Sequence, residues 1–250
     1  MTKGNNRTTW TEDFRVRAYE ADTTGALRPD VLCDYMQEAA AKHADHLGLG
    51  AEYLLKGGMA WVLSRLVVEI ERPPIWQETV PLVTWPSGHQ GIFATRDFLL
   101  GPEGSFARAT TAWFLIDIAR RRPVRLPESV DGLVLPDRPR ALIDDFARVP
   151  PIAVDAVGVE RAAGHTEIDM NGHVNHVRYL AWALDSMELD WHQKHRLRRV
   201  QVQYRTETRV GDVLTVLKAR VPDTDLTWNH EIRSGAGDLV AQARTDWLPR

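Results

Sequence analysis

Residues 167–172 read Glu-Ile-Asp-Met-Asn-Gly, and residues 20–25, 147 positions earlier, read Glu-Ala-Asp-Thr-Thr-Gly. After each copy, apolar residues recur at helical spacing, first from Pro29 to Leu47 and again from Val177 to Leu189. Strand-like runs punctuated by proline and glycine follow each predicted helix. Their bounds are 61–71, 78–85, 92–100 and 106–117 in the first half and 199–205, 212–221, 227–233 and 239–247 in the second. The chain is therefore organised as a repeat.

A second pair of matching segments supports the repeat. The pattern Ala-x-Ala-x-Thr-x-Trp occurs at residues 107–113 and again at residues 241–247, an offset of 134. One helix followed by antiparallel strands, occurring twice, predicts an α+β chain in which each half wraps a sheet around a long helix. Five prolines between residues 126 and 151 are typical of a linker. We expect a first repeat at 1–130, a linker at 131–155 and a second repeat at 156–250.

The second copy of the repeat carries side chains suited to acyl chemistry. Asp169, Asn171 and His173 alternate, and alternate residues of an extended run share one face. The helix that follows offers backbone N–H groups and a positive dipole end to a developing oxyanion. These features favour a hydrolase that acts on an acyl group. The alternative is a structural loop with a satisfied histidine, in which Asn175 is simply the helix N-cap.

Composition excludes several other classes of protein. A chain of 250 residues with 44% hydrophobic residues can form two modest cores. Its net charge of −3 argues against a nucleic-acid binder, so we expect its nine tryptophans to fill the cores. Cys33 is the single cysteine, which excludes a disulfide framework and indicates a core residue. No apolar run reaches the length of a membrane span, and the polar start lacks an apolar signal segment. We expect a cytoplasmic protein that binds no membrane.

Several long segments, in the same order, resemble the acyl-acyl carrier protein thioesterases of plant plastids and bacteria, a double hot-dog family. The resemblance extends from about Phe14 to Trp247. The segments that carry it are Phe14–Glu20, Gln37–Ala44, Trp61–Arg72, Asp169–Asn175 and Tyr204–Thr208. It implies a tandem hot-dog fold and the hydrolysis of acyl-acyl carrier protein to free fatty acid and holo-carrier in fatty acid biosynthesis.

The resemblance also implies a catalytic set. The Asp-x-Asn-x-His motif of the family falls on Asp169, Asn171 and His173, and its later Glu-Cys pair falls on Glu207 and Thr208. Because threonine stands where the family has cysteine, catalysis is expected to use carboxylate, imidazole and water rather than a thiolate. Whether Asp169 attacks directly, or Glu207 and His173 activate a water, is left open by the sequence.

The repeat predicts one active site per chain. At the positions of the first half that match the aspartate, asparagine and histidine stand Asp22, Thr24 and Ala26, and the position that matches the glutamate is Pro73. The first half therefore lacks the imidazole, the amide and the glutamate. We expect it to be a structural and acyl-binding half.

Alternatives to the leading function are an acyl-coenzyme A thioesterase, a non-catalytic acyl-binding or regulatory protein, and a dehydratase, because related folds serve these roles. We expect no cofactor and no metal, since the histidine pairs at 43/46 and 192/195 lack a clear third ligand. The expected partner is an acyl carrier protein that presents the substrate on its phosphopantetheine arm. Its candidate contacts are two arginine runs: Arg120, Arg121, Arg122 and Arg125, or Arg196, Arg198 and Arg199. The second run is favoured, because it lies close in sequence to the strand that leads to Glu207. Acyl chain length and oligomeric state are left open, and a homodimer is one of the states allowed.

Overall fold

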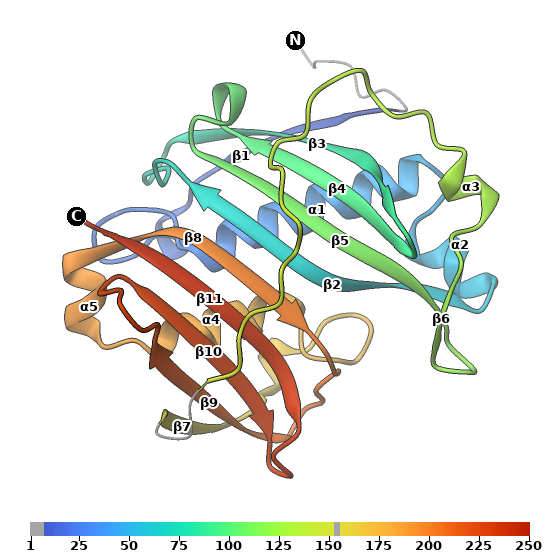
Figure 1. Ribbon diagram of the computed structural model, residues 1–250. Helices are drawn as coiled ribbons and strands as arrows, with labels where there is room; N and C mark the ends of the chain where they lie inside the picture. The colour runs from blue at the N-terminus through green and yellow to red at the C-terminus, as the bar shows by residue number, and fades with distance from the viewer. Residues whose placement is uncertain (1–7, 153–155) are drawn as a thin grey trace. The chain divides into compact units, whose positions relative to one another are not determined.

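A computed structural model describes residues 8–152 and 156–250 of the chain (Figure 1). Its contacts divide the chain into two compact units, the first ending at Asp145 and the second beginning at Phe146. This boundary lies inside the segment expected as a linker. Residues 153–155 of that segment, and residues 1–7 of the first expected repeat, lie outside the described residues. No helix of the described residues has both the length and the apolar character needed to cross a membrane.

The first unit is an antiparallel sheet with the long helix α1 (Pro29–His46) against it. The strands lie in the order β1-β3-β4-β5-β2, and β6 pairs with the end of β5. Their bounds are β1 Trp10–Arg15, β2 Met59–Ile70, β3 Thr79–Gln90, β4 Phe93–Leu100, β5 Ala107–Asp117 and β6 Arg122–Val124. Two short helices, α2 (Ala51–Lys56) and α3 (Glu128–Asp131), and two 3-10 turns, Ala18–Glu20 and Pro102–Gly104, complete the unit.

The second unit repeats this arrangement. Its strands lie in the order β8-β11-β10-β9-β7, again all antiparallel. Their bounds are β7 Val157–Ala162, β8 His195–Tyr204, β9 Val213–Arg220, β10 Thr227–Ser234 and β11 Leu239–Pro249. Helix α4 (His176–Asp185) packs against β9, β10 and β11, and the 3-10 turn His165–Glu167 and the short helix α5 (Leu189–Lys194) flank it. Each unit thus has one principal helix against one sheet, as expected.

Local sequence explains where the two principal helices begin and end. Helix α1 begins with Pro29, whose fixed φ suits a first helical position, and it ends before Gly48, which has φ +72°. The second predicted helix, Val177–Leu189, is too long at its end, because α4 stops at Asp185. The Ser186 hydroxyl turns back to donate to the Ala183 carbonyl (2.6 Å). Glu188 is extended, and α5 begins after it.

The eight predicted strands are confirmed within a few residues at each end. Besides the three-residue β6, the sequence prediction missed β1 and β7, which open the two units. Both strands lie at the edge of their sheet and carry charged side chains, so they lack the apolar alternation that marks a buried strand.

The repeat seen in the sequence is also present in the contacts. In the first unit the Trp113 indole N–H donates to the Thr111 hydroxyl at 2.9 Å, and Trp247 donates to Thr245 at 2.9 Å in the second. The pairing of β2 with β5 shifts register where Leu63 meets Trp113, and that of β11 with β8 shifts where Trp247 meets Leu197. The offset of 134 therefore relates strands that share both their pairing register and the position of their register shift.

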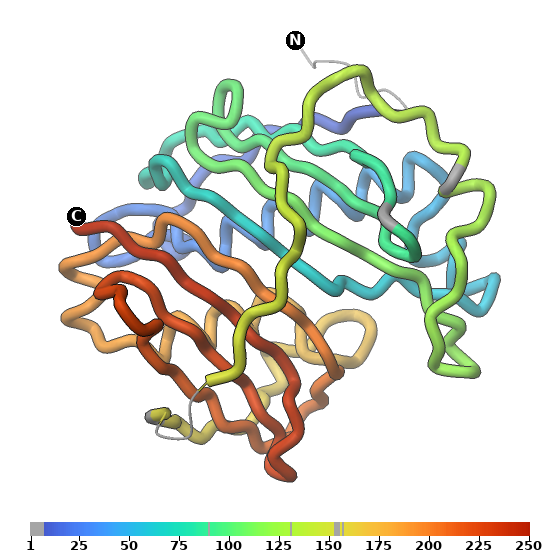
Figure 2. Tube along the Cα trace, viewed as in Figure 1, coloured from blue at the N-terminus to red at the C-terminus, as the bar shows by residue number. Residues whose placement is uncertain are grey.

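The expected linker is bound to the units it joins, each part to its own sheet (Figure 2). Asp97, which is fully buried in the first unit, accepts hydrogen bonds from the Arg140 guanidinium (2.7 and 3.0 Å) and from the Ala141 N–H (2.7 Å). Glu231 is the matching residue of the second unit and accepts from the Ile152 N–H at 3.1 Å. One buried carboxylate in each sheet thus anchors the segment that passes over it.

The cores contain the residues expected there. Cys33 is buried on α1, and Trp85, Trp182 and Trp247 are buried as predicted. The prediction fails for Trp76, which is 54% exposed. It follows Pro73 and Pro74, which match Glu207 and Thr208, at a position where the second unit has Val210.

Candidate active site

The motif of Asp169, Asn171 and His173 forms a tight turn, so the prediction of an extended run is wrong. The Gly172 N–H donates to the Asp169 carbonyl at 3.0 Å, and the Asn171 N–H donates to Asp169 Oδ1 at 2.8 Å. Gly172 has φ +77°, a conformation that glycine adopts without steric cost. The spacing of the motif therefore reflects an Asx turn rather than the alternation of a strand.

Backbone hydrogen bonds fix this turn on the body of the second unit. The Asp169 N–H donates to the His173 carbonyl (2.9 Å), and Ile168 and Val174 form a bridge that closes the base of the turn. The Val174 N–H then donates to the carbonyl of Thr208 at 2.8 Å. This last bond ties the turn to the segment that follows β8, where Glu207 lies.

The structure brings His173 and Glu207 together. The distance from His173 Nε2 to Glu207 Oε2 is 3.3 Å, and the two side chains are 27% and 40% exposed. A carboxylate at this distance accepts from the imidazole or shares a water with it, which is the arrangement of a general base that solvent and substrate can reach. Asp169 is engaged in the turn, and the Asn171 side chain is exposed at its tip, without a hydrogen bond to the pair in the described structure.

The first unit contains the same turn without the histidine, the asparagine and the glutamate that are expected to be catalytic. The Thr24 N–H donates to Asp22 Oδ1 at 2.8 Å, and the Gly25 N–H donates to the Asp22 carbonyl at 3.0 Å. The Leu27 N–H donates to the Pro74 carbonyl at 2.8 Å, as Val174 does to Thr208. The scaffold is therefore common to both halves, and the groups suited to catalysis are present in one.

A glutamate supports the turn in each unit, a role that the sequence prediction did not assign. Glu167 accepts from the Gly164 N–H (2.7 Å), from Arg161 (2.6 Å) and from the Trp182 indole N–H (2.7 Å). Glu20 accepts in the same way from Arg17 and from Tyr35, which is the counterpart of Trp182. The repeated glutamate two positions before each aspartate was the available signal.

Aromatic and neutral groups lie behind the turn. Tyr179 is buried, and burial raises the pKa of its hydroxyl to about 12. Burial also lowers the pKa of His176 to about 4, and this ring meets Tyr204 edge-on. Asn175 caps α4 as predicted, because its side chain accepts from the Val177 N–H at 2.9 Å. Near neutral pH these side chains add no charge to the site.

The histidine pairs considered as metal ligands have protein contacts instead. His43 is fully buried, with Nδ1 3.1 Å from Arg96, and burial lowers its pKa to about 3. His192 Nε2 lies 3.0 Å from the Leu184 carbonyl, and His195 stacks on Trp191. The described residues contain no group of three potential metal ligands.

Comparison with known proteins relates both halves to one family. Residues 7–132 match the family model of the acyl-ACP thioesterase N-terminal domain, and residues 162–249 match that of the C-terminal domain. A chloroplastic acyl-[acyl-carrier-protein] hydrolase of Cuphea viscosissima is 28% identical over 257 residues, which cover 95% of this chain and 61% of that protein. The chain thus spans about three fifths of the length of the first curated relatives that it matches.

Solved structures agree with this assignment. An acyl-ACP thioesterase from Bacteroides thetaiotaomicron aligns with a TM-score of 0.87 and 25% identity, over 96% of this chain and 98% of its own. The 12:0-ACP thioesterase from Umbellularia californica also aligns with a TM-score of 0.87 and 25% identity, over 99% of this chain and all of its own. The predicted double hot-dog fold is thereby confirmed. Two matched domain models and these full-length alignments show that the chain belongs to the acyl-ACP thioesterase family.

Proposed function

We propose that the protein hydrolyses the thioester of acyl-acyl carrier protein to free fatty acid and holo-carrier. The observation that carries the proposal is the pair formed by His173 and Glu207, 3.3 Å apart beside a turn that both halves share. The half without this pair keeps the scaffold, so the pair is not needed to form the turn. The thioesterase names of the relatives support the same reaction.

In the proposed mechanism, Glu207 and His173 activate a water that attacks the thioester carbonyl. The carboxylate holds the imidazole or the water, and the imidazole takes the proton of that water and passes it to the departing sulfur. The backbone N–H of His173 has no acceptor among the described residues, whereas those of Gly172 and Val174 are bonded to protein carbonyls. We therefore assign the oxyanion to the His173 N–H, with the exposed Asn171 amide orienting the water or the substrate.

Water is preferred over Asp169 as the nucleophile. Asp169 Oδ1 already accepts a hydrogen bond from the Asn171 N–H. Asp22 accepts the equivalent hydrogen bond in the half that lacks the histidine. Asp169 is then a positioning residue of the turn. A thiolate is not a candidate, because burial raises the pKa of the Cys33 thiol and Thr208 holds the turn through its carbonyl.

One assay separates this proposal from its alternatives. Release of free thiol is measured for a panel of acyl-carrier and acyl-coenzyme A substrates of different chain lengths. The proposal expects higher kcat/KM with the carrier-bound substrates. Preference for acyl-coenzyme A would move the protein to that class, and binding without hydrolysis would indicate an acyl-binding protein.

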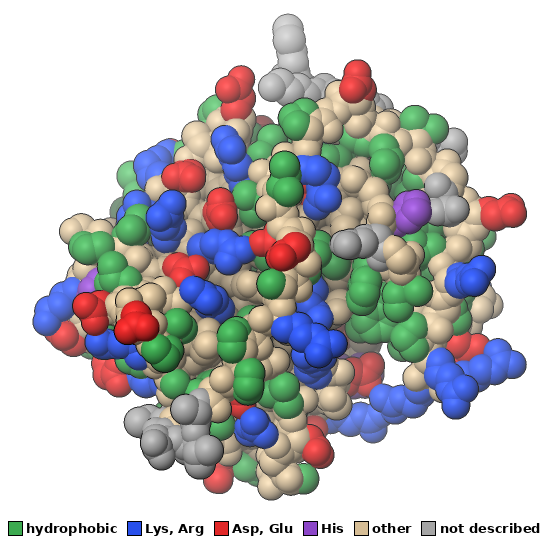
Figure 3. All heavy atoms as spheres, viewed as in Figure 1, with side chains coloured by type: hydrophobic (Ala, Val, Ile, Leu, Met, Phe, Trp, Pro, Cys, Tyr) green, Lys and Arg blue, Asp and Glu red, His purple; other side chains and the backbone are tan. Residues whose placement is uncertain are grey.

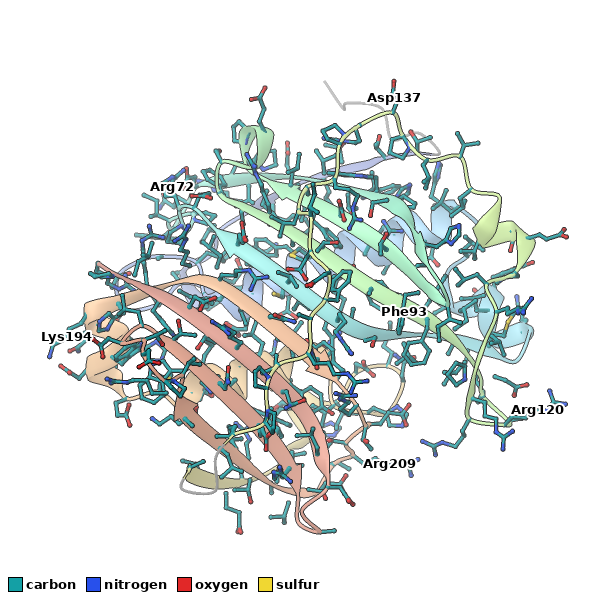
Figure 4. The ribbon with its side chains drawn as sticks, viewed as in Figure 1. Arg72, Phe93, Arg120, Asp137, Lys194 and Arg209 are labelled. Carbon is teal, nitrogen blue, oxygen red and sulfur yellow. The ribbon has the colours of Figure 1, made fainter. Side chains whose placement is uncertain are left out.

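Recognition of the carrier is proposed to use one of the two arginine runs. Arg120, Arg121, Arg122 and Arg125 are all exposed in and around β6. Figure 4 labels Arg120 at the lower right, and Figure 3 shows Lys and Arg side chains gathered at that edge. In the run on β8, which the sequence prediction favoured, only Arg198 is exposed, and Arg196 and Arg199 are half-buried. Two arginines of each run are changed to glutamate in separate variants. The variant of the run that contacts the carrier should have a lower kcat/KM for the carrier-bound substrate, most strongly at low salt. Hydrolysis of a short pantetheine thioester should change little, and equal effects on both substrates would make that run structural.

The cellular location and the oligomeric state of the protein are each open to a direct test. We keep the cytoplasmic location predicted from the sequence, although the curated plant relatives are named as chloroplastic. Fractionation of the source cells tests it. Sedimentation of the purified protein decides between a monomer and the homodimer that the sequence allows.

A further inference from the structure

Asn171 and Gly172 form the one Asn–Gly pair of the 250-residue sequence, and they lie at the tip of the turn that carries His173. The Asn171 side chain is exposed and has no hydrogen bond in the described structure. A methyl group built on Gly172 would meet no atom within 4 Å, so the space around this peptide is open. By contrast, the Asn175 side chain is held as a helix cap, and Asn229 is buried.

We propose that Asn171 is a site of spontaneous deamidation, which inactivates the enzyme as it ages. The Gly172 nitrogen attacks Asn171 Cγ, the new N–Cγ bond closes a five-membered succinimide, and the Cγ–Nδ2 bond breaks. The amide nitrogen leaves as ammonia with the proton lost by the Gly172 N–H. Water then opens the imide at either carbonyl and leaves an aspartate or an isoaspartate at position 171. No oxidant or further reactant is needed.

The local structure sets one condition for this reaction. The Gly172 N–H is bonded to the Asp169 carbonyl at 3.0 Å, so the turn must open before the nitrogen can attack. At an exposed tip, water replaces the hydrogen bond between the Gly172 N–H and the Asp169 carbonyl. Gly172 has no Cβ to obstruct the backbone rotation that brings its nitrogen to Asn171 Cγ. The first unit has Thr24 at the matching position and cannot undergo the reaction.

The products disturb the proposed site in two ways, and this part of the inference rests on the proposed function. Isoaspartate adds one main-chain atom to the turn between Asp169 and His173. The ends of this turn are held by the hydrogen bonds from the Asp169 N–H to the His173 carbonyl and from the Val174 N–H to the Thr208 carbonyl. The distance of 3.3 Å from His173 to Glu207 cannot survive that insertion, and a displacement of about 1 Å costs on the order of a hundredfold in rate. An ordinary aspartate places a second carboxylate beside Asp169.

The test follows the purified 250-residue protein during incubation at neutral to mildly alkaline pH. Peptide mass spectrometry measures the conversion of amide to acid at residues 171, 175 and 229, and an isoaspartate assay identifies the second product. Activity and the folded fraction are measured on the same samples. The Gly172→Asn variant is the matched control, because asparagine tolerates positive φ but obstructs ring closure. Asn171→Gln is the second control if that variant fails to fold. Each protein is compared with its own starting activity.

We expect conversion at residue 171 ahead of 175 and 229, a fractional loss of activity equal to the modified fraction, and slower conversion and loss in Gly172→Asn. An intact Asn171 in protein that has lost activity while still folded would overturn the proposal. Full activity in largely modified protein would overturn the inactivation. If the fresh protein hydrolyses no thioester, the proposed function fails, and the mass measurement still decides whether Asn171 is modified.

Discussion

Asp169 and Asp22 accept the same backbone hydrogen bond, 2.8 Å long in each case, but only Asp169 is followed by a histidine four residues later. An internal repeat thus provides a control that a single site would lack. What the two turns share is structural, and what only the second contains is a candidate for chemistry. On this criterion we propose that His173, Asn171 and Glu207 take part in the chemistry and that the aspartate positions the turn.

His173 and Glu207 are each expected to be needed for turnover. We expect His173→Ala and Glu207→Gln each to lower kcat by at least about a hundredfold, because each removes a general acid–base group. Melting temperature and circular dichroism should stay close to those of the parent, since both side chains are partly exposed.

Thr208→Ala is the matched control for that experiment. It keeps the backbone carbonyl that accepts from Val174 and removes only the hydroxyl and the γ-methyl group of the side chain, so its effect should be much smaller. A loss as large as that of Glu207→Gln would place the nucleophile at residue 208 and contradict the mechanism.

Substitutions of Asp169 distinguish a residue that holds the turn from a residue that acts as the nucleophile. Asparagine keeps an oxygen that accepts from the Asn171 N–H and weakens that bond by about 1 kcal/mol, so Asp169→Asn should retain activity within about tenfold. Asp169→Ala removes the acceptor and should be clearly worse in steady-state kinetics. Activity of Asp169→Asn as low as that of His173→Ala would instead support direct attack by the carboxylate.

At the scale of elements, α4 connects stability to the site. Its cap, Asn175, also donates its own N–H to the Glu167 carbonyl at 2.9 Å, so the helix start and the turn share a residue. Asn175→Ala should lower the free energy of unfolding by about 1 kcal/mol in urea denaturation. Asn175→Asp keeps a capping oxygen and should restore most of the loss. If both variants lose the same amount, the cap does not stabilise the helix.

For the whole molecule, the difference between the repeats predicts a stoichiometry. Ala26 and Pro73 replace the histidine and the glutamate in the first unit, so each chain should hold one competent site. Titration with a tight, non-hydrolysable substrate analogue should saturate near one equivalent per chain. Two equal and independent sites would be incompatible with the assignment of a structural first half.

Buried histidines of both units predict how stability depends on pH. Burial lowers the pKa of His43 and of His230 to about 3, against about 6.5 in an unfolded chain. Between these values the unfolded chain binds more protons, so the free energy of unfolding is highest above about pH 6.5 and falls as pH drops toward 3. Each histidine adds a slope of up to about 1.4 kcal/mol per pH unit.

Urea denaturation at about pH 7 and about pH 5 measures this slope. His230→Gln, which keeps polar atoms near Ser186 and Thr245, should show a shallower dependence than the parent. An unchanged slope would mean that His230 does not contribute to it.

The sequence by itself determined the repeat, helix α1, most strands and the family, because these depend on periodicity and on matches that extend along the chain. The resemblance, rather than any local signal, also placed His173 and Glu207 in one expected catalytic set, although they lie 34 residues apart. The edge strands β1 and β7 escaped because charged edge strands lack apolar alternation.

Only the tertiary structure decided how the motif is folded. Alternating polar residues suit an extended strand or an Asx turn equally well, and the choice depends on hydrogen bonds to partners elsewhere in the chain. Here the bond from Val174 to the Thr208 carbonyl brings the turn to the end of β8 and thus His173 to Glu207. Such a bond joins groups that are distant in sequence, so no local pattern encodes it.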